Sequence, residues 1–249
     1  KPQTLAEICR QKLDSLSQNT TIYVAKQKPK TLKIIKNILK NNKSKKVFAS
    51  SFKIKKIKDY YVYKDPKNTI PIRTNHIHSE GLINNLGLAI KVALDFGVPK
   101  KIITNTIPKI QFEGRLQYLT KGKFKKLLKK EEKLLIDGCH SMASAENLYN
   151  YLKTLKEPIY GIWGMQKNKL PEQFIKSFKK IFKKLVTVPI PNEPNALTAI
   201  ELQNIGQKYM PTIAAQNVTS ALRQISNNER KTIVIFGSLY LIGDVLSKN

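Results

Sequence analysis

Five short apolar runs alternate with five amphipathic stretches through the second half of the chain, and this alternation constrains the fold more than any other feature. Strands that alternate with helices in this way form a parallel sheet whose two faces are both covered by helices. We therefore predict that residues 111–249 form a Rossmann-like α/β domain with a mostly parallel sheet. The expected strands are 133–137, 158–164, 186–190, 212–214 and 232–237, and the expected helices are 142–155, 171–184, 196–208, 216–227 and 238–247.

Residues 1–110 show a mixed pattern, which we interpret as a separate domain that ends near Pro108. The clearest element is the stretch 81–97, which is apolar on much of its surface and ends at Gly97, as a buried helix would. Strands are expected at 20–26, 45–50 and 59–64, and helices at 31–42, 81–97 and 99–109. Extended chain is expected at 112–119, and a basic hairpin or loop at 121–132.

The formal net charge of +28 invites a nucleic-acid interpretation, but the kind of cation favours another one. The chain holds 40 lysines against five arginines, and the lysines are spread over nearly every segment. A protein that reads bases needs arginine forks or aromatic side chains among its charges. The pattern is typical of a composition bias towards lysine, asparagine and isoleucine on solvated faces. A functional basic surface that attracts anionic ligands is the open alternative.

The remaining composition predicts a soluble globular protein of the cytoplasm. Hydrophobic residues make up 41% of the chain, and no apolar run approaches the ~20 residues that a membrane span needs. The opening residues lack the apolar segment of a signal peptide. Cys9 and Cys139 stand at no spacing typical of a disulfide framework or a zinc site, so reduced thiols are expected. Because the sequence opens at Lys1 as if inside a longer one, we expect an upstream segment.

Three of the expected strands end in segments that could carry chemistry: DGCH at 137–140, GMQKNK at 164–169 and GS at 237–238. In an open parallel sheet, ligands bind at the carboxyl ends of the strands. The predicted ligand site of this domain therefore lies at that edge of the sheet.

Glycines and serines at these strand ends suit an anionic ligand. Gly138, Gly164 and Gly237 would let the backbone turn sharply and let a ligand come close. Ser141 and Ser238 would cap the following helices, whose free N–H groups and positive dipole attract a phosphate or a carboxylate. A glycine and a capping serine are also common where a strand leads into a helix in α/β proteins, without any ligand. A histidine there can be a turn residue whose hydrogen bonds are all made within the chain. No GxGxxG follows the first strand, and the chain contains no GxxxxGK[ST] phosphate-binding loop.

Six segments, in order along nearly the whole chain, are similar to the motifs of one enzyme family. FEGRLQ (112–117) is similar to Trp-Pro-Gly-Arg-Leu-Gln, LLIDGCHS (134–141) to Asp-Gly-Ala-His-Asn, and VIFGSLYLIGDVL (234–246) to Gly-Ser-x-Tyr-x-x-Gly-Glu. The other three segments are TLAEICRQKLDSL (4–16), INNLGLAI (83–90) and GMQKNKL (164–170). These motifs resemble those of the folylpolyglutamate synthase/dihydrofolate synthase family, within the Mur ligase superfamily.

The resemblance implies a fold and an activity. Residues 1–110 would be the C-terminal remainder of the family's central ATPase-type domain, and 111–249 its Rossmann-like C-terminal domain. Members use ATP and Mg²⁺ to join L-glutamate to a folate or dihydropteroate carboxylate. ATP phosphorylates the carboxylate and the glutamate amine attacks the acyl phosphate, so cations and donors must surround the phosphoryl group.

The resemblance also implies roles for individual residues. Arg115 would reach the phosphates, and His140 would lie near the phosphoryl group and the incoming glutamate. The implied site residues are catalytic His140 and Arg115, nucleotide-binding Asp137, Arg115, Asn85 and Ser238, and Lys12, if carbamylated, as a metal ligand.

The chain also departs from the family pattern. The phosphate-binding loop and a magnesium-binding histidine lie upstream of the first shared motif in the family. Gly81-Leu82 replaces a His-Gln pair, Ser141 replaces the asparagine after the histidine, and Gln11 replaces the glutamate before Lys12. Losing one polar contact to a substrate can cost several powers of ten in rate.

Three hypotheses follow. The chain is part of a folate ligase whose P-loop half is encoded upstream or supplied by a separate polypeptide. It is a degenerate member that neither hydrolyses ATP nor ligates glutamate. It is a basic anion- or nucleic-acid-binding protein on a relict ligase scaffold. We expect the chain alone to be inactive, its partners to be small molecules, and neither a membrane nor nucleic acid to be a partner.

Overall fold

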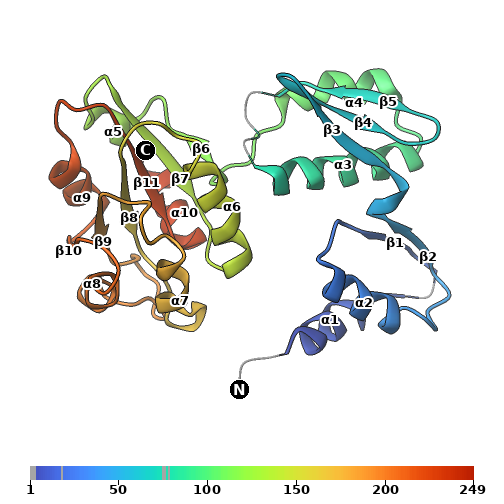
Figure 1. Ribbon diagram of the computed structural model, residues 1–249, viewed down its shortest axis with the longest axis horizontal. Helices are drawn as coiled ribbons and strands as arrows, with labels where there is room; N and C mark the ends of the chain where they lie inside the picture. Colours follow the sequence, from blue (N-terminus) through green and yellow to red (C-terminus); the bar gives the residue numbers. More distant parts are fainter. Residues whose placement is uncertain (1–3, 18, 75–76, 78) are drawn as a thin grey trace. The chain divides into compact units, whose positions relative to one another are not determined.

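The computed structural model describes residues 4–17, 19–74, 77 and 79–249. The chain divides into two compact units, one formed by Lys1–Asn75 and Glu80–Ile110 and the other by His76–Ser79 and Gln111–Asn249. Figure 1 shows the helices and strands of both units. None of the described helices is long and apolar enough to cross a membrane.

The first unit begins with a small α/β layer. Strands β1 (Thr21–Val24) and β2 (Lys45–Phe48) pair in parallel, and helices α1 (Leu5–Leu13) and α2 (Pro29–Ile38) precede them. Helix α1 begins at a capping box, in which the Thr4 side chain accepts from the Glu7 amide and the Glu7 carboxylate accepts from the Thr4 amide. A core of buried residues joins the layer, made of Ile22, Val24 and Leu39.

An antiparallel sheet and two helices complete the first unit. Strands β3 (Lys53–Ile57), β4 (Tyr60–Lys64) and β5 (Thr69–Ile72) form a meander. The remaining elements are the 3₁₀ turns η1 (Ala49–Ser51) and η2 (Ile107–Lys109) and the helices α3 (Glu80–Asp95) and α4 (Lys100–Thr106). Helix α3 packs tightly on the meander, because a Cβ at Gly87 would come within 2.7 Å of the Ile54 side chain.

The second unit is built on one six-stranded sheet of order β10-β9-β8-β11-β7-β6 (Figure 1). All neighbours pair in parallel except β6 and β7, which are antiparallel, so the predicted mostly parallel sheet is confirmed. The strands are β6 (Gln117–Tyr118), β7 (Glu132–Asp137), β8 (Ile159–Trp163), β9 (Lys184–Thr187), β10 (Thr212–Ala214) and β11 (Lys231–Phe236).

Helices cover both faces of this sheet, as the continuous apolar strands require. One core contains Leu134 and Ile136 of β7 with α9 (Val218–Ile225) and α10 (Leu239–Lys248). The other contains Leu135 with α6 (Met142–Leu152), α7 (Pro171–Lys176) and α8 (Ala199–Gly206). Successive residues of β7 thus face opposite cores, which is the period of two expected for a strand.

Three local predictions were wrong. Residues 121–132 contain a one-turn helix, α5 (Lys123–Lys126), instead of a hairpin or loop. Helix α7 ends at Lys176 rather than near 184, and Lys180 further on has a φ of 74°, which a helix cannot continue. Only Gln117–Tyr118 of the expected extended stretch 112–119 is a strand, because Gly114 and Leu116 both have positive φ and turn the chain.

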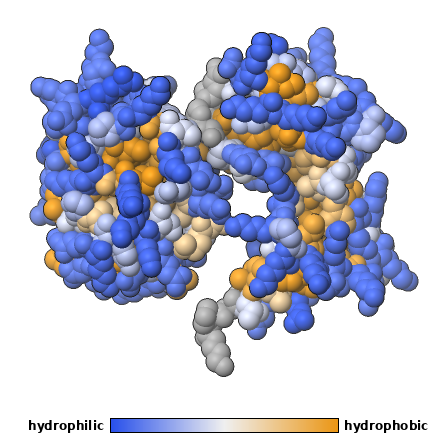
Figure 2. Space-filling view, viewed as in Figure 1, coloured by the Kyte–Doolittle hydropathy of each residue, from blue (hydrophilic) through white to orange (hydrophobic). Residues whose placement is uncertain are grey.

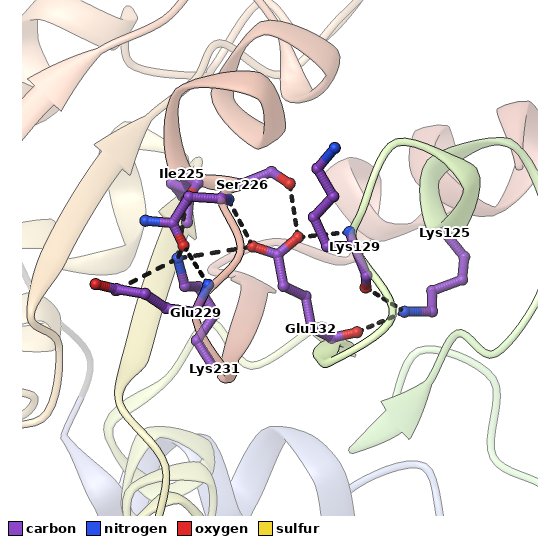
Figure 3. Close-up of polar contacts among 8 residues, drawn as sticks. Lys125, Lys129, Glu132, Ile225, Ser226, Glu229 and Lys231 are labelled. Carbon is purple, nitrogen blue, oxygen red and sulfur yellow. Dashed lines mark hydrogen bonds and ion pairs between the residues drawn. The ribbon is translucent and has the colours of Figure 1, made fainter.

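A buried polar network closes the amino ends of β7 and β11 (Figure 3). Of the lysines that the structure describes, Lys231 alone is buried, and its Nζ lies 3.6 Å from Oε1 of the buried Glu132. Nζ also donates to the carbonyl of Ile225, at 3.2 Å, and to Oδ1 of Asn227. The other described lysines are exposed or half-buried, and on the face shown in Figure 2 hydrophilic residues cover most of each unit.

Candidate functional site

The three strand ends that could carry chemistry lie next to one another at one edge of the second unit's sheet. Strand β11 lies between β8 and β7, so the segments that follow these strands are neighbours although they are far apart in the sequence. The register brings Phe236 opposite both Asp137 and Trp163. The segments 137–140, 164–169 and 237–238 therefore leave the sheet at the same level.

Asp137, the last residue of β7, is buried and bonded to backbone amides. Its Oδ2 accepts from the Leu116 amide at 2.8 Å, and its Oδ1 accepts from the Cys139 amide at 2.8 Å. Burial raises the pKa of Asp137, while these amides and the nearby Arg115 guanidinium act in the opposite direction. With one oxygen on each amide, the carboxylate braces the strand end against the turn at 112–117.

That turn carries Arg115. Gly114, with a φ of 66°, makes the turn possible, and its carbonyl accepts from the Gly138 amide at 2.8 Å. Gln117 closes the turn, because its Oε1 accepts from the Gly114 amide at 2.8 Å. Arg115 itself is half-buried, and within the described residues its guanidinium is paired with no acid. The turn thus leaves this cation available for an anionic ligand.

His140 stands beside the turn with one ring nitrogen already used. Its Nδ1 lies 2.9 Å from the carbonyl of Gly138, and a carbonyl only accepts, so Nδ1 carries the hydrogen and donates. The neutral ring therefore has its lone pair on Nε2. The side chain is half-buried, so Nε2 can meet a ligand at the edge of the sheet.

Both predicted capping serines cap their helices. The Ser141 hydroxyl accepts from the Ser144 amide at the start of α6, and the Ser238 hydroxyl accepts from the Tyr240 amide, at 3.2 Å, at the start of α10. Ser238 is buried, so its hydroxyl serves the helix. The remaining amides of these two first turns have no partner within their helices, and they point to the same edge as Arg115.

The glycines of the strand ends serve packing more than ligand approach, which corrects our expectation. A Cβ at Gly138 would meet the Leu239 side chain at 2.4 Å, and one at Gly164 would meet the Val188 carbonyl at 3.0 Å. Gly237, with a φ of 110°, is the one of the three whose backbone requires glycine. At each position the space is taken by atoms of this chain.

Two fully buried residues next to this edge were not predicted as site residues. Burial, followed by the charge of Asp137, raises the pKa of the Cys139 thiol well above its usual value, so this cysteine stays protonated and unreactive. Trp163 ends β8, and its Nε1–H has no hydrogen-bond partner among the described residues. Its apolar neighbours in the strand gave no signal of an unpaired donor at the strand end.

Two implied site residues belong to the first unit. Asn85 is exposed on α3, whereas its neighbour Asn84 lines a pocket at the ends of β1 and β2. Lys12 is exposed in the last turn of α1. In the part of the chain that the structure describes, no three histidine, cysteine, aspartate or glutamate side chains are grouped as a metal site would need. Within the second unit, the structure brings together Arg115, Asp137, His140 and Ser238.

Comparison with known proteins shows which family this chain is similar to. A protein-family model described as "Dihydrofolate synthetase, C-terminal domain" matches residues 120–248, slightly more than half of the chain. Dihydrofolate synthetase of Saccharomyces cerevisiae is 24% identical over 162 residues, which are 60% of this chain and 38% of the yeast protein.

Solved structures share the fold. Folylpolyglutamate synthase of Mycobacterium tuberculosis, complexed with ADP and AMPPCP, gives a TM-score of 0.79 at 17% identity, over 99% of this chain and 60% of that one. A bifunctional folylpolyglutamate synthase/dihydrofolate synthase with Mn, AMPPNP and L-glutamate bound gives 0.78 at 15% identity, over 99% and 57%. The chain thus spans well under two thirds of these relatives. With its C-terminal domain matched in sequence and both units matched in fold, the chain belongs to the folylpolyglutamate synthase/dihydrofolate synthase family.

Proposed function

We propose that this chain provides the C-terminal part of an ATP-dependent ligase that joins L-glutamate to a folate or dihydropteroate carboxylate. The observation that carries the proposal is the corner formed by Arg115, His140 and the first turns of α6 and α10, in a chain that belongs to this family. We further propose that residues 1–110 are the remainder of the central ATPase-type domain and that 111–249 are the C-terminal domain.

The corner fits the phosphate groups of a nucleotide. Arg115 supplies a cation without an acid partner in the described residues, and two helix starts supply amides and positive dipoles. Phosphoryl transfer needs such positive groups around the oxygens that gain charge. Relatives of the same fold have been solved with ADP, AMPPCP and AMPPNP, which supports a nucleotide as the ligand.

His140 can serve the amine that attacks. A glutamate amine must lose a proton as it forms the amide bond, and neutral His140 has its lone pair on Nε2 because Nδ1–H is bonded to the Gly138 carbonyl. In this proposal Arg115 binds and orients the phosphate groups and His140 Nε2 takes the proton. Asp137 contacts neither substrate and positions Arg115 through the Leu116 amide.

Among the described residues we find no group of side chains that fits a metal site. Both oxygens of Asp137 accept from backbone amides, and the described residues contain no group of three acidic, histidine or cysteine ligands. One relative of this fold holds Mn. A carbamylated Lys12 as a metal ligand in the first unit of this chain remains a prediction.

Nucleotide binding to the corner tests the first half of the proposal. We expect ATP, added to the ¹⁵N-labelled chain, to shift the amide signals of the segments 114–116, 138–143 and 237–240. In Arg115→Ala the affinity should fall about tenfold or more, because a charge-assisted contact is lost. The matched control is Arg223→Ala, an exposed arginine of α9. Shifts elsewhere, or equal affinity of the two variants, would show that the corner is not the nucleotide site.

Ligation by the purified chain tests the second half. We expect no ATP- and glutamate-dependent product from tetrahydrofolate or dihydropteroate, because the sequence contains no GxxxxGK[ST] loop to hold the β- and γ-phosphates. Clear turnover that disappears in Arg115→Ala would show that these residues suffice without that loop.

A further inference from the structure

A second cavity, in the first unit, is chemically unlike the corner. It has a volume of about 600 Å³, which lies within the range of small-molecule sites. It opens where the parallel strands β1 and β2 end, beside β3 and the start of α3. The lining residues are Val24, Ala25, Lys26, Gln27, Leu32, Lys36, Phe48, Ala49, Ser50, Phe52, Lys53, Ile54, Lys55 and Asn84.

The charges of this cavity have one sign. Lys26, Lys36, Lys53 and Lys55 line it, and none of the described aspartates or glutamates does. All four lysine side chains are exposed, so they can move their ammonium groups over the opening without losing hydration. Lys26 has an ion pair with Glu80, at 3.2 Å, in which both side chains are well exposed, and an exposed pair of this kind is weak. An anion in the cavity would therefore meet several cations, and the Glu80 carboxylate lies beside one of them without being part of the lining.

The walls of the same cavity are apolar and aromatic. Phe48, Phe52, Leu32 and Ile54 contribute to them, with the amides of Gln27 and Asn84 and the hydroxyl of Ser50 among them. Lys36 Nζ lies 5.5 Å from the centre of the Phe48 ring, so one cation is held over an aromatic face. The composition bias of the chain explains lysines at the rim, but it does not explain a hollow with aromatic walls beneath them.

Two other cavities of the described residues lack this combination. The cavity beside β6 and β7 has Lys125, Lys130 and Lys133 but also Glu132 in its lining. The cavity between α3 and α4 is lined by apolar residues and Thr106. The position at the carboxyl ends of two parallel strands also favours the first cavity, because ligands of α/β sheets bind there.

We propose that this cavity binds an organic anion that has an aromatic or apolar body and at least two negatively charged groups. The body lies against Phe48 and Phe52, and the charged groups meet the lysines at the rim. All residues of this site belong to the first unit, whereas Arg115 and His140 belong to the second, so variants can test the two proposals separately.

Three probes separate the parts of this proposal. 1,5-Naphthalenedisulfonate has an aromatic body and two charges, inorganic pyrophosphate has charges without the body, and 2-naphthol has the body without strong charge. We expect the disulfonate to bind the ¹⁵N-labelled full chain at least tenfold more tightly than either other probe. Its binding should shift the amide signals of Ala49, Ser50 and Asn84. The affinity should also fall as the salt concentration rises from 50 to 200 mM, because exposed charges are screened.

A pair of matched double variants decides the outcome. Lys36→Gln/Lys53→Gln removes two cations of the rim, and we expect the disulfonate affinity to fall about tenfold. Lys179→Gln/Lys183→Gln removes two exposed lysines of the second unit and should leave the affinity unchanged. Equal losses in both variants, or shifts scattered over many surface lysines, would overturn the proposal in favour of non-specific attraction to a basic protein. Stronger binding of 2-naphthol than of the disulfonate would show an apolar site without selectivity for anions.

Discussion

Replacing Lys231 by methionine should destabilise the second unit more than any other change to one lysine. Lys231 Nζ is fully buried, lies 3.6 Å from Glu132 Oε1 and donates to the Ile225 carbonyl (Figure 3). It also lies 4.9 Å from the centre of the Tyr160 ring. Methionine keeps much of the length of the side chain but leaves the Glu132 carboxylate buried without its cation. Breaking a buried pair from one side costs about 3–5 kcal/mol, although the pair itself adds little to stability.

Glu132 keeps other donors, and they set the expected cost near the lower end of that range. Its Oε2 accepts from the Lys129 amide at 2.8 Å and from the Ser226 hydroxyl at 2.6 Å, and its Oε1 accepts from the Asn227 amide at 2.9 Å. We therefore expect a loss of about 3 kcal/mol, or a melting temperature about 10 °C lower for a unit of this size.

Urea denaturation followed by tryptophan fluorescence measures this loss. Trp163 is the one tryptophan of the chain and is fully buried in the second unit, so its emission reports the unfolding of that unit. Lys133→Met is the matched control, because Lys133 pairs with Glu157 at 2.8 Å from a side chain that is 47% exposed. That control should lose about 1 kcal/mol or less.

A double variant separates charge from packing. Glu132→Gln/Lys231→Met removes both charges, so it should be about 1–2 kcal/mol more stable than the sum of the two single losses predicts. A loss in Lys231→Met no larger than in Lys133→Met, or strict additivity in the double variant, would refute the view that an uncompensated buried charge is responsible.

Three further changes test other contacts. The hydrogen bond from Lys133 holds the pKa of Glu157 at about 2. This pair therefore stabilises the protein above pH 4.5, and the stabilisation is lost as the pH falls towards 2. In urea titrations at several pH values, Glu157→Gln should remove about 1 kcal/mol of that dependence on acid. Gly237→Ala should cost roughly 3 kcal/mol or more in the same assay, because its φ is 110° and a Cβ would come within 2.5 Å of the Gly164 carbonyl. Cys139 should react with a thiol reagent only after unfolding, and fast labelling of the native protein would contradict its burial.

The sequence predicted the second unit well because its signal is local and repeated. Each strand of the parallel sheet is apolar on both faces, and capping residues mark where helices begin, as Ser141 and Ser238 do. The strands β3 and β5 of the first unit were missed. KIKKI in β3 is mostly exposed and Pro71 interrupts β5, so neither run carries a clear apolar pattern.

The candidate site was predictable only in part, because contacts between distant segments decide what each polar group does. The sequence placed Asp137 and His140 at a strand end, and the family motif added Arg115. The sequence could not show that β11 lies between β8 and β7. This strand order is what brings the segments 137–140, 164–169 and 237–238 together. The sequence also could not show that the carboxylate of Asp137 is taken up by the amides of Leu116 and Cys139.

The two readings of Asp137 make different predictions for Asp137→Asn. An asparagine keeps the shape of the side chain but sets an NH₂ group against one backbone amide, which leaves a buried donor unsatisfied at about 1–3 kcal/mol. If Asp137 is a brace, the Leu116 amide should exchange with deuterium faster, ATP affinity should fall as far as in Arg115→Ala, and the double variant should lose little more than either single one. If the carboxylate contacts the nucleotide itself, the losses of Asp137→Asn and Arg115→Ala should add, and exchange at Leu116 should stay slow. We expect the first result, because both oxygens of Asp137 already accept from backbone amides. One of these amides belongs to Leu116, the residue after Arg115, so the same hydrogen bond also fixes the backbone of Arg115.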